Sequence, residues 1–378
     1  MVSDDDTQQP VEKGDWLRAI IRYCRDICVA ARCLSPFSTR FQASRDPPSR
    51  GLRRFVVKLL CFAALQVAVL AAVDFRLARL PNSYSIKVRR LAAAADPPVE
   101  VLLLGSSHEL YGLNPDELNL SAVNLAGYSQ DLYYDAQLVR CYLDRLPALK
   151  CVVMGLSYFT LEYDMEQSTE AWRSCYYRRY FGIPHRHAWL EFQPGNYSLV
   201  FQYGPKLARS LLLDEHPPDV TGNVRANGWA EFSVPEDPAA AVRDGEQRVT
   251  AHHTLMHAEN GARNLAILDE LFDELRQRNI QVVLVTTPVY ETYSANFDPV
   301  RQERWQAAVR HLQSRHGVLH FDFTNDPRFG LRDFSNSDHL NRDGAAKLSR
   351  LFGQELQVAC RLSGTLLART NGSGQSKQ

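Results

Sequence analysis

Residues 99–108 read VEVLLLGSSH, a short apolar run that ends abruptly in glycine and two serines. Residues 151–155 (CVVMG) repeat this pattern, and further apolar runs follow at residues 122–125, 281–286 and 318–323. Helical patterns separate these runs, at residues 131–146, 258–278, 299–315 and 342–356. Because continuous apolar strands alternate with helices, the sequence predicts an α/β fold whose parallel sheet is covered on both faces.

A functional site is expected at the ends of the predicted strands. In parallel α/β sheets, ligands bind beyond the carboxyl ends of the strands. Gly105, Gly155 and Thr287 all follow such ends. Residues 160–250 interrupt the alternation, carry many aromatic residues and prolines, and are too many for a plain loop in a compact domain. We therefore expect an insertion after the third strand that forms a cap or a substrate-facing lobe.

Composition narrows the class of protein. The chain has 378 residues, with 43 Lys and Arg against 43 Asp and Glu, so its formal net charge is zero. Without a global positive field, we expect no nucleic-acid partner. Three of the eight cysteines lie close together, but Cys24, Cys28 and Cys33 lack the CxxC pairs of a zinc ribbon or a redox dithiol. The sequence predicts neither a cofactor nor a metal centre.

Residues 55–73 (FVVKLLCFAALQVAVLAAV) predict a transmembrane helix. Their only charge is Lys58, near one end. At the helical rise per residue the segment is about 28 Å long, close to the thickness of a bilayer's hydrocarbon core. A buried core helix is the alternative, and a cleavable signal peptide fits less well because the run begins far from the N-terminus.

Basic residues on the two sides of this segment predict its orientation. Five arginines precede it, and three basic residues follow within a similar distance: Arg40, Arg45, Arg50, Arg53 and Arg54 before it, and Arg76, Arg79 and Lys87 after it. The positive-inside rule then places the N-terminus in the cytoplasm and the large C-terminal domain on the extracytoplasmic side, periplasmic or extracellular.

The chain is therefore expected to have four parts. Residues 1–54 form a cytoplasmic segment with an amphipathic helix at 14–33, whose apolar and basic stripes suit either a membrane surface or a partner protein. Residues 55–73 span the membrane, and residues 96–362 form the α/β domain with its insertion at 160–250. Residues 363–378, rich in Asn, Gly, Ser and Gln, form a disordered tail.

Two motifs carry candidate chemistry. Ser107 follows the first predicted strand on a glycine turn, where its hydroxyl can reach the sheet's carboxyl edge and nearby backbone N–H groups can hold an oxyanion. His339 lies in Asn336-Ser337-Asp338-His339, just before the last helix, where it can act as a general base. Each motif alone is common, but together they form a specific nucleophile–base constellation.

In order and spacing, these motifs resemble the SGNH, or GDSL-like, hydrolase superfamily. The chain is most similar to the membrane-anchored group that includes alginate O-acetylation proteins and teichoic-acid D-alanyl-transfer proteins. The resemblance implies a flavodoxin-like three-layer SGNH hydrolase fold over about residues 99–352. It also implies Ser107 as nucleophile, Gly127 as oxyanion-hole residue in Asn124-Leu125-Ala126-Gly127, and His339 as base.

Two positions depart from the family pattern. Ser157 stands where the third block has an asparagine that donates to the oxyanion, and Asn336 stands where the triad has an aspartate. An amide orients a neutral imidazole but stabilises the imidazolium poorly. Asp338 is the other candidate partner of His339. We expect Asn336 to orient His339 and Asp338 to turn toward solvent or to cap the closing helix.

Two classes of function follow from this resemblance. The first is a membrane-anchored serine O-acyltransferase or esterase that acts on cell-envelope or exported polysaccharide through an acyl-serine. The alternative is a catalytically degenerate subunit that binds polysaccharide or scaffolds an acylation complex. The expected partners are an acylated envelope substrate, the membrane and a membrane-bound acyl-donor protein.

Three other groups of residues have both a functional and a structural interpretation. One is a histidine cluster that could supply a zinc pair or belong to a polar surface: His252, His253 and His257. Another is a pair of histidines beside arginines, which could bind an anion or lie on a solvated basic face: His185 and His187. The third is a set of tyrosines that could line a sugar platform or fill the core: Tyr128, Tyr133, Tyr134 and Tyr158.

Overall fold

The computed structural model describes residues 48–79, 81–92, 98–202 and 223–360. The chain divides into two units, Met1–Val67 and Ala68–Gln378. The predicted amphipathic helix at 14–33 and the tail at 363–378 lie outside the described residues.

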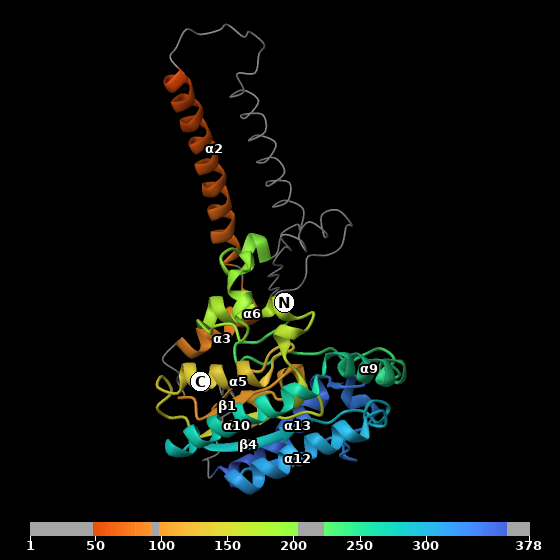
Figure 1. Ribbon diagram of the computed structural model, residues 1–378. Helices are drawn as coiled ribbons and strands as arrows, with labels where there is room; N and C mark the ends of the chain where they lie inside the picture. The colour runs from red at the N-terminus through yellow and green to blue at the C-terminus, as the bar shows by residue number, and fades with distance from the viewer. Residues whose placement is uncertain (1–47, 80, 93–97, 203–222, 361–378) are drawn as a thin grey trace, which may run out of the picture. The chain divides into compact units, whose positions relative to one another are not determined.

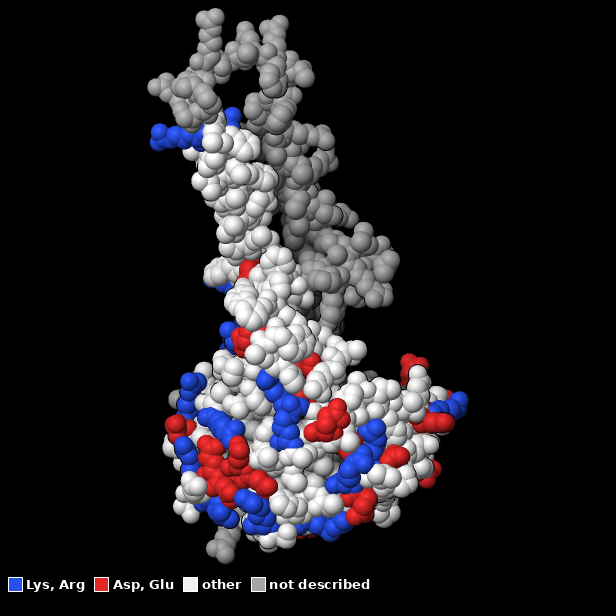
Figure 2. Space-filling model, in the orientation of Figure 1, with Lys and Arg blue, Asp and Glu red and all other residues white. Residues whose placement is uncertain are grey.

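Helix α2 (Pro48–Leu77) contains the predicted transmembrane segment. Within the described part of the chain, it is the one helix long and apolar enough to cross a membrane, over Gly51–Leu77. None of its most apolar stretch is buried, so the alternative of a buried core helix does not hold. Figure 2 shows a helix surface almost free of charge along its length, with basic residues near its N-terminal end.

Five parallel strands form the central sheet, in the order β2-β1-β3-β4-β5. This is the flavodoxin-like order, so the predicted α/β class and parallel sheet are confirmed. The strands are β1 (Val101–Leu104), β2 (Ala122–Asn124), β3 (Cys151–Gly155), β4 (Gln281–Thr286) and β5 (Leu319–Asp322).

Alternate residues of each strand feed two hydrophobic cores. Leu102 and Leu104 of β1 belong to one core with side chains from α5 (Leu132–Tyr142), α10 (Ala258–Gln277) and α12 (Pro299–His316). Val101 and Leu103 belong to the other core, with Leu348, Phe352 and Leu356 from α13 (Arg342–Ala359). Because both faces are covered, the central strands β1 and β3 are apolar and buried along their length, and three layers result (Figure 1).

Short helices and one hairpin complete the domain. Helix α3 (Ser83–Ala92) precedes β1, and α4 (Ser107–Gly112) and η1 (Pro115–Glu117) follow it. Helix α11 (Glu291–Ser294) follows β4. Near the end of the chain, η8 (Leu331–Asp333) leads into an antiparallel pair that the sequence did not predict, β6 (Phe334–Asn336) and β7 (His339–Leu340).

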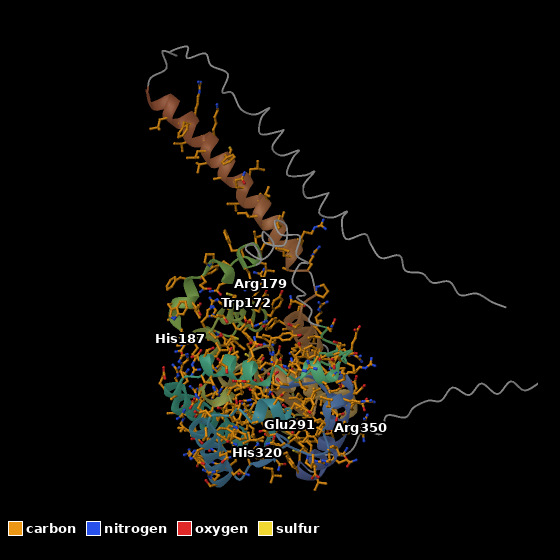
Figure 3. All side chains as sticks on the ribbon, turned by 90° about the vertical axis from the view of Figure 1, so that its right-hand side faces the viewer. Trp172, Arg179, His187, Glu291, His320 and Arg350 are labelled. Atoms are coloured by element: carbon orange, nitrogen blue, oxygen red, sulfur yellow. The ribbon has the colours of Figure 1, made fainter. Side chains whose placement is uncertain are left out.

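The described part of the insertion after β3 consists of short helical turns and one longer helix, and it adds no strand to the central sheet. In chain order these elements are η2 (Thr160–Glu162), η3 (Met165–Gln167), η4 (Ala171–Arg173), α6 (Ser174–Tyr176), η5 (Tyr177–Phe181), η6 (Ala188–Phe192), η7 (Pro194–Asn196), α8 (Pro238–Ala241) and α9 (Gly245–Leu255). Figure 3 shows Trp172, Arg179 and His187 gathered in this insertion, at the other end of the unit from His320 and Arg350.

A buried glutamate lies beneath the turn after β1. Glu109 is fully buried, and its Oε2 accepts hydrogen bonds from the backbone N–H (2.9 Å) and the hydroxyl (3.3 Å) of Ser106. The Glu109 carboxyl lies against Gly105 and Gly155, where a Cβ atom would overlap it. Gly105 also has a φ of +137°, a conformation that favours glycine. The strand-end glycines therefore make room for the carboxyl that holds the turn.

Gly155→Ala should lower the stability of the domain, because the new methyl group would collide with the Glu109 carboxyl. Overpacking of this kind typically costs about 1–3 kcal/mol. Thermal unfolding of the full chain in detergent measures the effect. Gly261→Ala in α10 is the matched control, since its Cβ would meet only Glu162 Cγ at 4.0 Å. An equal melting temperature for the two variants would contradict the packing described here.

Stability should also depend on pH through Glu109. Burial raises the pKa of Glu109 to about 8. The unfolded chain loses this proton near its ordinary value, so the folded state loses stability as pH rises from about 4.5 to about 8, by on the order of a few kcal/mol. Glu109→Gln cannot ionise and should gain stability relative to wild type between pH 5 and pH 8. Denaturant unfolding at pH 5 and at pH 8 measures the free energy of unfolding of each variant, with the surface variant Glu303→Gln as control. The same change in this free energy with pH for wild type and Glu109→Gln would refute the prediction.

Candidate active site

Ser107 and His339 lie within hydrogen-bonding distance of each other. Ser107 is the first residue of α4, directly after the turn at the end of β1, and Ser106 caps this helix. His339 begins β7. The Ser107 Oγ atom is 2.8 Å from His339 Nε2, although the two residues are 232 positions apart in the sequence. This is the distance that a nucleophile and its general base require.

The other ring nitrogen of His339 faces two oxygen atoms. Its Nδ1 lies 3.1 Å from Asn336 Oδ1 and 3.1 Å from Asp338 Oδ1. The expectation that Asp338 turns toward solvent or caps the closing helix is wrong, because Asp338 is only 1% exposed and the cap of α13 is Asn341. Asn341 fits that role since its side chain accepts hydrogen bonds from the N–H groups of Asp343 and Gly344.

Asn336 and Asp338 have different contacts. Asn336 Oδ1 also accepts from the backbone N–H groups of Asp338 (3.2 Å) and His339 (2.9 Å), so it fixes the turn between β6 and β7. Asp338 supplies charge. Burial works to raise the pKa of Asp338, but the charge of His339 and a hydrogen bond from His108 hold it well below its ordinary value. The carboxylate is therefore ionised beside the imidazole.

Three further residues surround Asp338: His252, whose Nε2 lies 3.9 Å from Asp338 Oδ2, and two residues that the sequence did not single out. Arg248, on α9, places its Nη2 2.9 Å from Asp338 Oδ2 and contacts Oδ1 through Nε. His108 places its Nε2 3.4 Å from the same Oδ2. His108 was visible beside Ser107 in the sequence, but no local pattern could have assigned Arg248, which lies in the aperiodic insertion.

The two expected oxyanion donors are engaged elsewhere. The backbone N–H of Gly127 donates to Gly105 O at 3.0 Å, and Ser157 Oγ lies 3.0 Å from His108 Nδ1. As placed here, Gly127 ties two strand-end turns together and Ser157 contacts His108, and the oxyanion roles of both residues stay predictions. The backbone N–H of Ser107, at the first position of α4, belongs to the group that has no partner inside a helix.

A metal ion does not fit this site. His108, Asp338 and His339 bring possible ligand atoms within 4.8 Å of one another. However, the Arg248 guanidinium already binds both oxygens of the Asp338 carboxylate, and a second cation there would be repelled.

The candidate zinc pair is separated in the structure. Helix α9 ends at Leu255, and His257 is the residue before α10, so His253 and His257 do not share a helical face. His252 Nδ1 is 2.6 Å from the Tyr293 hydroxyl, and burial lowers the pKa of His252 to about 3. His253 Nε2 is 2.8 Å from the Tyr158 hydroxyl. These histidines are held by tyrosines.

The other candidate groups are mostly structural. His187 pairs with Asp164 at 2.9 Å and His185 lies 2.8 Å from Asn196 Oδ1, so both histidines have partners within the insertion. Tyr134 and Tyr158 are buried core residues, and Tyr133 packs on that core. Of the four tyrosines, Tyr128 alone lies in the aromatic group beside His339.

Three partly exposed aromatic rings lie beside the Ser107–His339 pair. Tyr111 stacks on Phe232 with ring centroids 4.5 Å apart and meets the His339 ring edge-on at 5.3 Å. Tyr128 packs edge-on against Tyr111 at 5.7 Å. All three rings are half-buried, so part of each is open to solvent next to the nucleophile.

Comparison with known proteins finds only distant structural similarity. No protein-family model matches the chain, and no curated protein matches it. Among solved structures, the chain is similar to a proposed acylhydrolase from Bacteroides fragilis (12% identity, TM-score 0.35, 74% of this chain and 96% of that one). It is also similar to a lipase/acylhydrolase from Enterococcus faecalis (11% identity, TM-score 0.34, 70% and 98%). At these scores, the α/β assignment rests on the strand order of the chain itself.

Proposed function

We propose that this protein is a membrane-anchored serine acyltransferase or esterase of the SGNH type. The observation that carries the proposal is the 2.8 Å distance between Ser107 Oγ and His339 Nε2 at the carboxyl end of the sheet. The ionised Asp338 and the Asn336 amide face the other ring nitrogen of His339. This arrangement supplies a nucleophile, a base and a group that stabilises the protonated base.

The reaction would proceed through an acyl-serine. His339 Nε2 takes the proton of Ser107 as Oγ attacks the acyl carbonyl, and the backbone N–H of Ser107 stabilises the oxyanion. His339 then gives this proton to the leaving oxygen as the ester bond breaks. In the second half, His339 deprotonates the acceptor, water or a sugar hydroxyl, which attacks the acyl-serine; the proton returns to Ser107 Oγ as the acyl group leaves.

The rings beside the nucleophile support a carbohydrate substrate. Tyr111, Tyr128 and Phe232 present partly exposed aromatic faces near His339. Flat apolar ring faces with nearby polar groups suit the apolar faces of sugars, and a few placed polar groups then fix orientation. With α2 in a membrane and the domain on the extracytoplasmic side, the substrate would be envelope or exported polysaccharide, and a membrane-bound protein would supply the acyl group.

One observation favours the second candidate, a degenerate subunit that binds polysaccharide or scaffolds an acylation complex. Two donors are expected for the oxyanion, the Ser157 hydroxyl and the Gly127 backbone N–H. Both have hydrogen-bond partners within the fold, His108 Nδ1 and Gly105 O. A site with a weakened oxyanion hole keeps its shape for binding but loses rate, roughly 10²–10³-fold per missing donor.

Labelling with a fluorophosphonate separates the two candidates. The full chain in detergent should become covalently labelled at Ser107, as peptide mass spectrometry would show. Ser107→Ala should abolish labelling, and His339→Ala should slow it by about 10⁴-fold or more, because the hydroxyl loses its base. Ser314→Ala, at an exposed serine of α12, is the matched control and should label normally. An unlabelled wild-type protein that is folded would favour the non-catalytic subunit.

Substitutions at the two partners of His339 test which one provides the charge. Asp338→Asn should lower ester hydrolysis by about 10²–10⁴-fold, since the imidazolium loses its ionised neighbour. Asn336→Asp should retain activity, since the new carboxylate keeps an oxygen that accepts hydrogen bonds from the backbone N–H groups of Asp338 and His339. Asp343→Asn, at the exposed start of α13, serves as the control. Full activity of Asp338→Asn together with loss in Asn336→Ala would assign the orienting role to Asn336 instead.

A further inference from the structure

An exposed aromatic surface lies in the insertion, away from the candidate active site. Outside α2, eight large apolar side chains of the described residues are strongly exposed, and four of them are aromatic residues between positions 189 and 201. They are Trp189 (60% exposed), Phe192 (84%), Tyr197 (66%) and Phe201 (57%). The other four, Val234, Val300, Leu319 and Val358, are aliphatic and scattered. Single exposed apolar residues need no explanation, but a cluster of aromatic ones points to a partner.

Hydrogen bonds hold these residues in one local surface. Trp189 and Phe192 lie on η6, and the Asn196 side chain in η7 donates to Leu190 O in η6 at 2.7 Å. The Tyr197 hydroxyl donates to Glu191 O at 2.9 Å, so its polar end is satisfied while its ring remains exposed. The two turns that carry Trp189, Phe192 and Tyr197 are therefore held against each other.

This surface is tied to the C-terminal end of the membrane helix. Asp74 follows directly after the predicted apolar span, which ends at Val73. Its Oδ1 accepts from the backbone N–H groups of Leu199 and Val200, the latter at 3.3 Å, and its Oδ2 pairs with Arg179 at 2.9 Å. Figure 3 labels Arg179 in this part of the insertion. Tyr197 and Phe201 are each within two residues of these contacts, less than about 8 Å along the chain.

The position of Asp74 determines what this surface meets. If α2 crosses a bilayer, its first carboxylate after the apolar run lies at the boundary between hydrocarbon and water. Residues bonded to that carboxylate lie at the same boundary. Tyrosine and tryptophan are enriched at this depth because their rings are apolar and their polar atoms reach the headgroups. Phe75, 56% exposed with the Arg79 guanidinium 4.0 Å above its ring, extends the same surface along α2.

Two ion pairs lie beside the aromatic surface. Arg178 pairs with Glu191, and Arg179 pairs with Asp74. Paired charges reduce the cost of moving the insertion out of bulk water.

We propose that Trp189, Phe192, Tyr197 and Phe201 insert into the headgroup region of the bilayer that α2 spans. The insertion is then a second, interfacial membrane contact, and with α2 it fixes the orientation of the α/β domain over the membrane surface. This inference rests on the proposed membrane placement of α2 and not on the acyl-transfer chemistry.

Fluorescence quenching in lipid nanodiscs tests this contact. The full chain is reconstituted in phosphatidylcholine whose acyl chains are brominated close to the headgroup. Trp189→Phe should remove a quenchable component of the tryptophan emission, whereas Trp305→Phe should not, because Trp305 is buried in the core. In unbrominated nanodiscs, Phe192→Ser with Phe201→Ser should increase quenching of Trp189 by aqueous iodide.

The controls separate this inference from the proposed function. Fluorophosphonate labelling of Ser107 should be unchanged in all these variants, which shows that the domain is folded. Lipid quenching that is the same in Trp189→Phe and wild type would overturn the interfacial contact. So would finding two copies of the chain in each nanodisc with Trp189 shielded from both bromine and iodide, since a second copy would then cover the surface. Failure of labelling in wild type with intact lipid quenching would reject the enzyme and leave the contact standing.

Discussion

The ionised carboxylate of Asp338, buried where three elements meet, is the constraint on which the candidate site depends. A buried charge is costly unless it is paired and hydrogen-bonded. Its partners come from separate parts of the chain: His108 from α4, Arg248 from α9 and His339 from β7. The interactions that offset the cost of burying the Asp338 carboxylate therefore also hold its partners in place. One of these partners is the His339 imidazole, which faces Ser107.

The sheet and the insertion contribute different things to this arrangement. The sheet brings the ends of β1 and β3 together, and the Glu109 carboxyl fills the space that Gly105 and Gly155 leave between them. The insertion supplies Arg248 through α9, so it is part of the candidate site as well as a covering lobe. At its other end, the insertion binds Asp74 of α2 through Leu199 and Arg179. One segment thus connects the end of α2 to the surroundings of His339.

The motif that the sequence resembles has an aspartate three residues before the histidine, where this chain has Asn336. The amide oxygen of Asn336 is used mainly to hold the backbone of the β6–β7 turn. That turn directs Asp338 inward instead of toward solvent, so the adjacent carboxylate reaches His339 Nδ1 at the same 3.1 Å as the amide. The side chains of adjacent residues usually point in different directions, but those of Asp338 and His339 meet here. The register of the β6–β7 hairpin shifts between Phe334 and Asn336, next to this contact.

Local patterns of the sequence determined the α/β class, the apolar helix at 55–73, and the places of a strand-end serine and of a histidine before the last helix. Those features depend on apolar periodicity, on segment length and on residues that follow strand ends, which neighbouring positions in the chain set directly. Tertiary structure alone decided the hairpin that carries His339, the burial of Asp338, the arrival of Arg248 and the use of Gly127 N–H by Gly105 O. Each of these is a contact between residues distant in sequence, and no local pattern specifies which distant group will satisfy a buried charge or a strand-end amide.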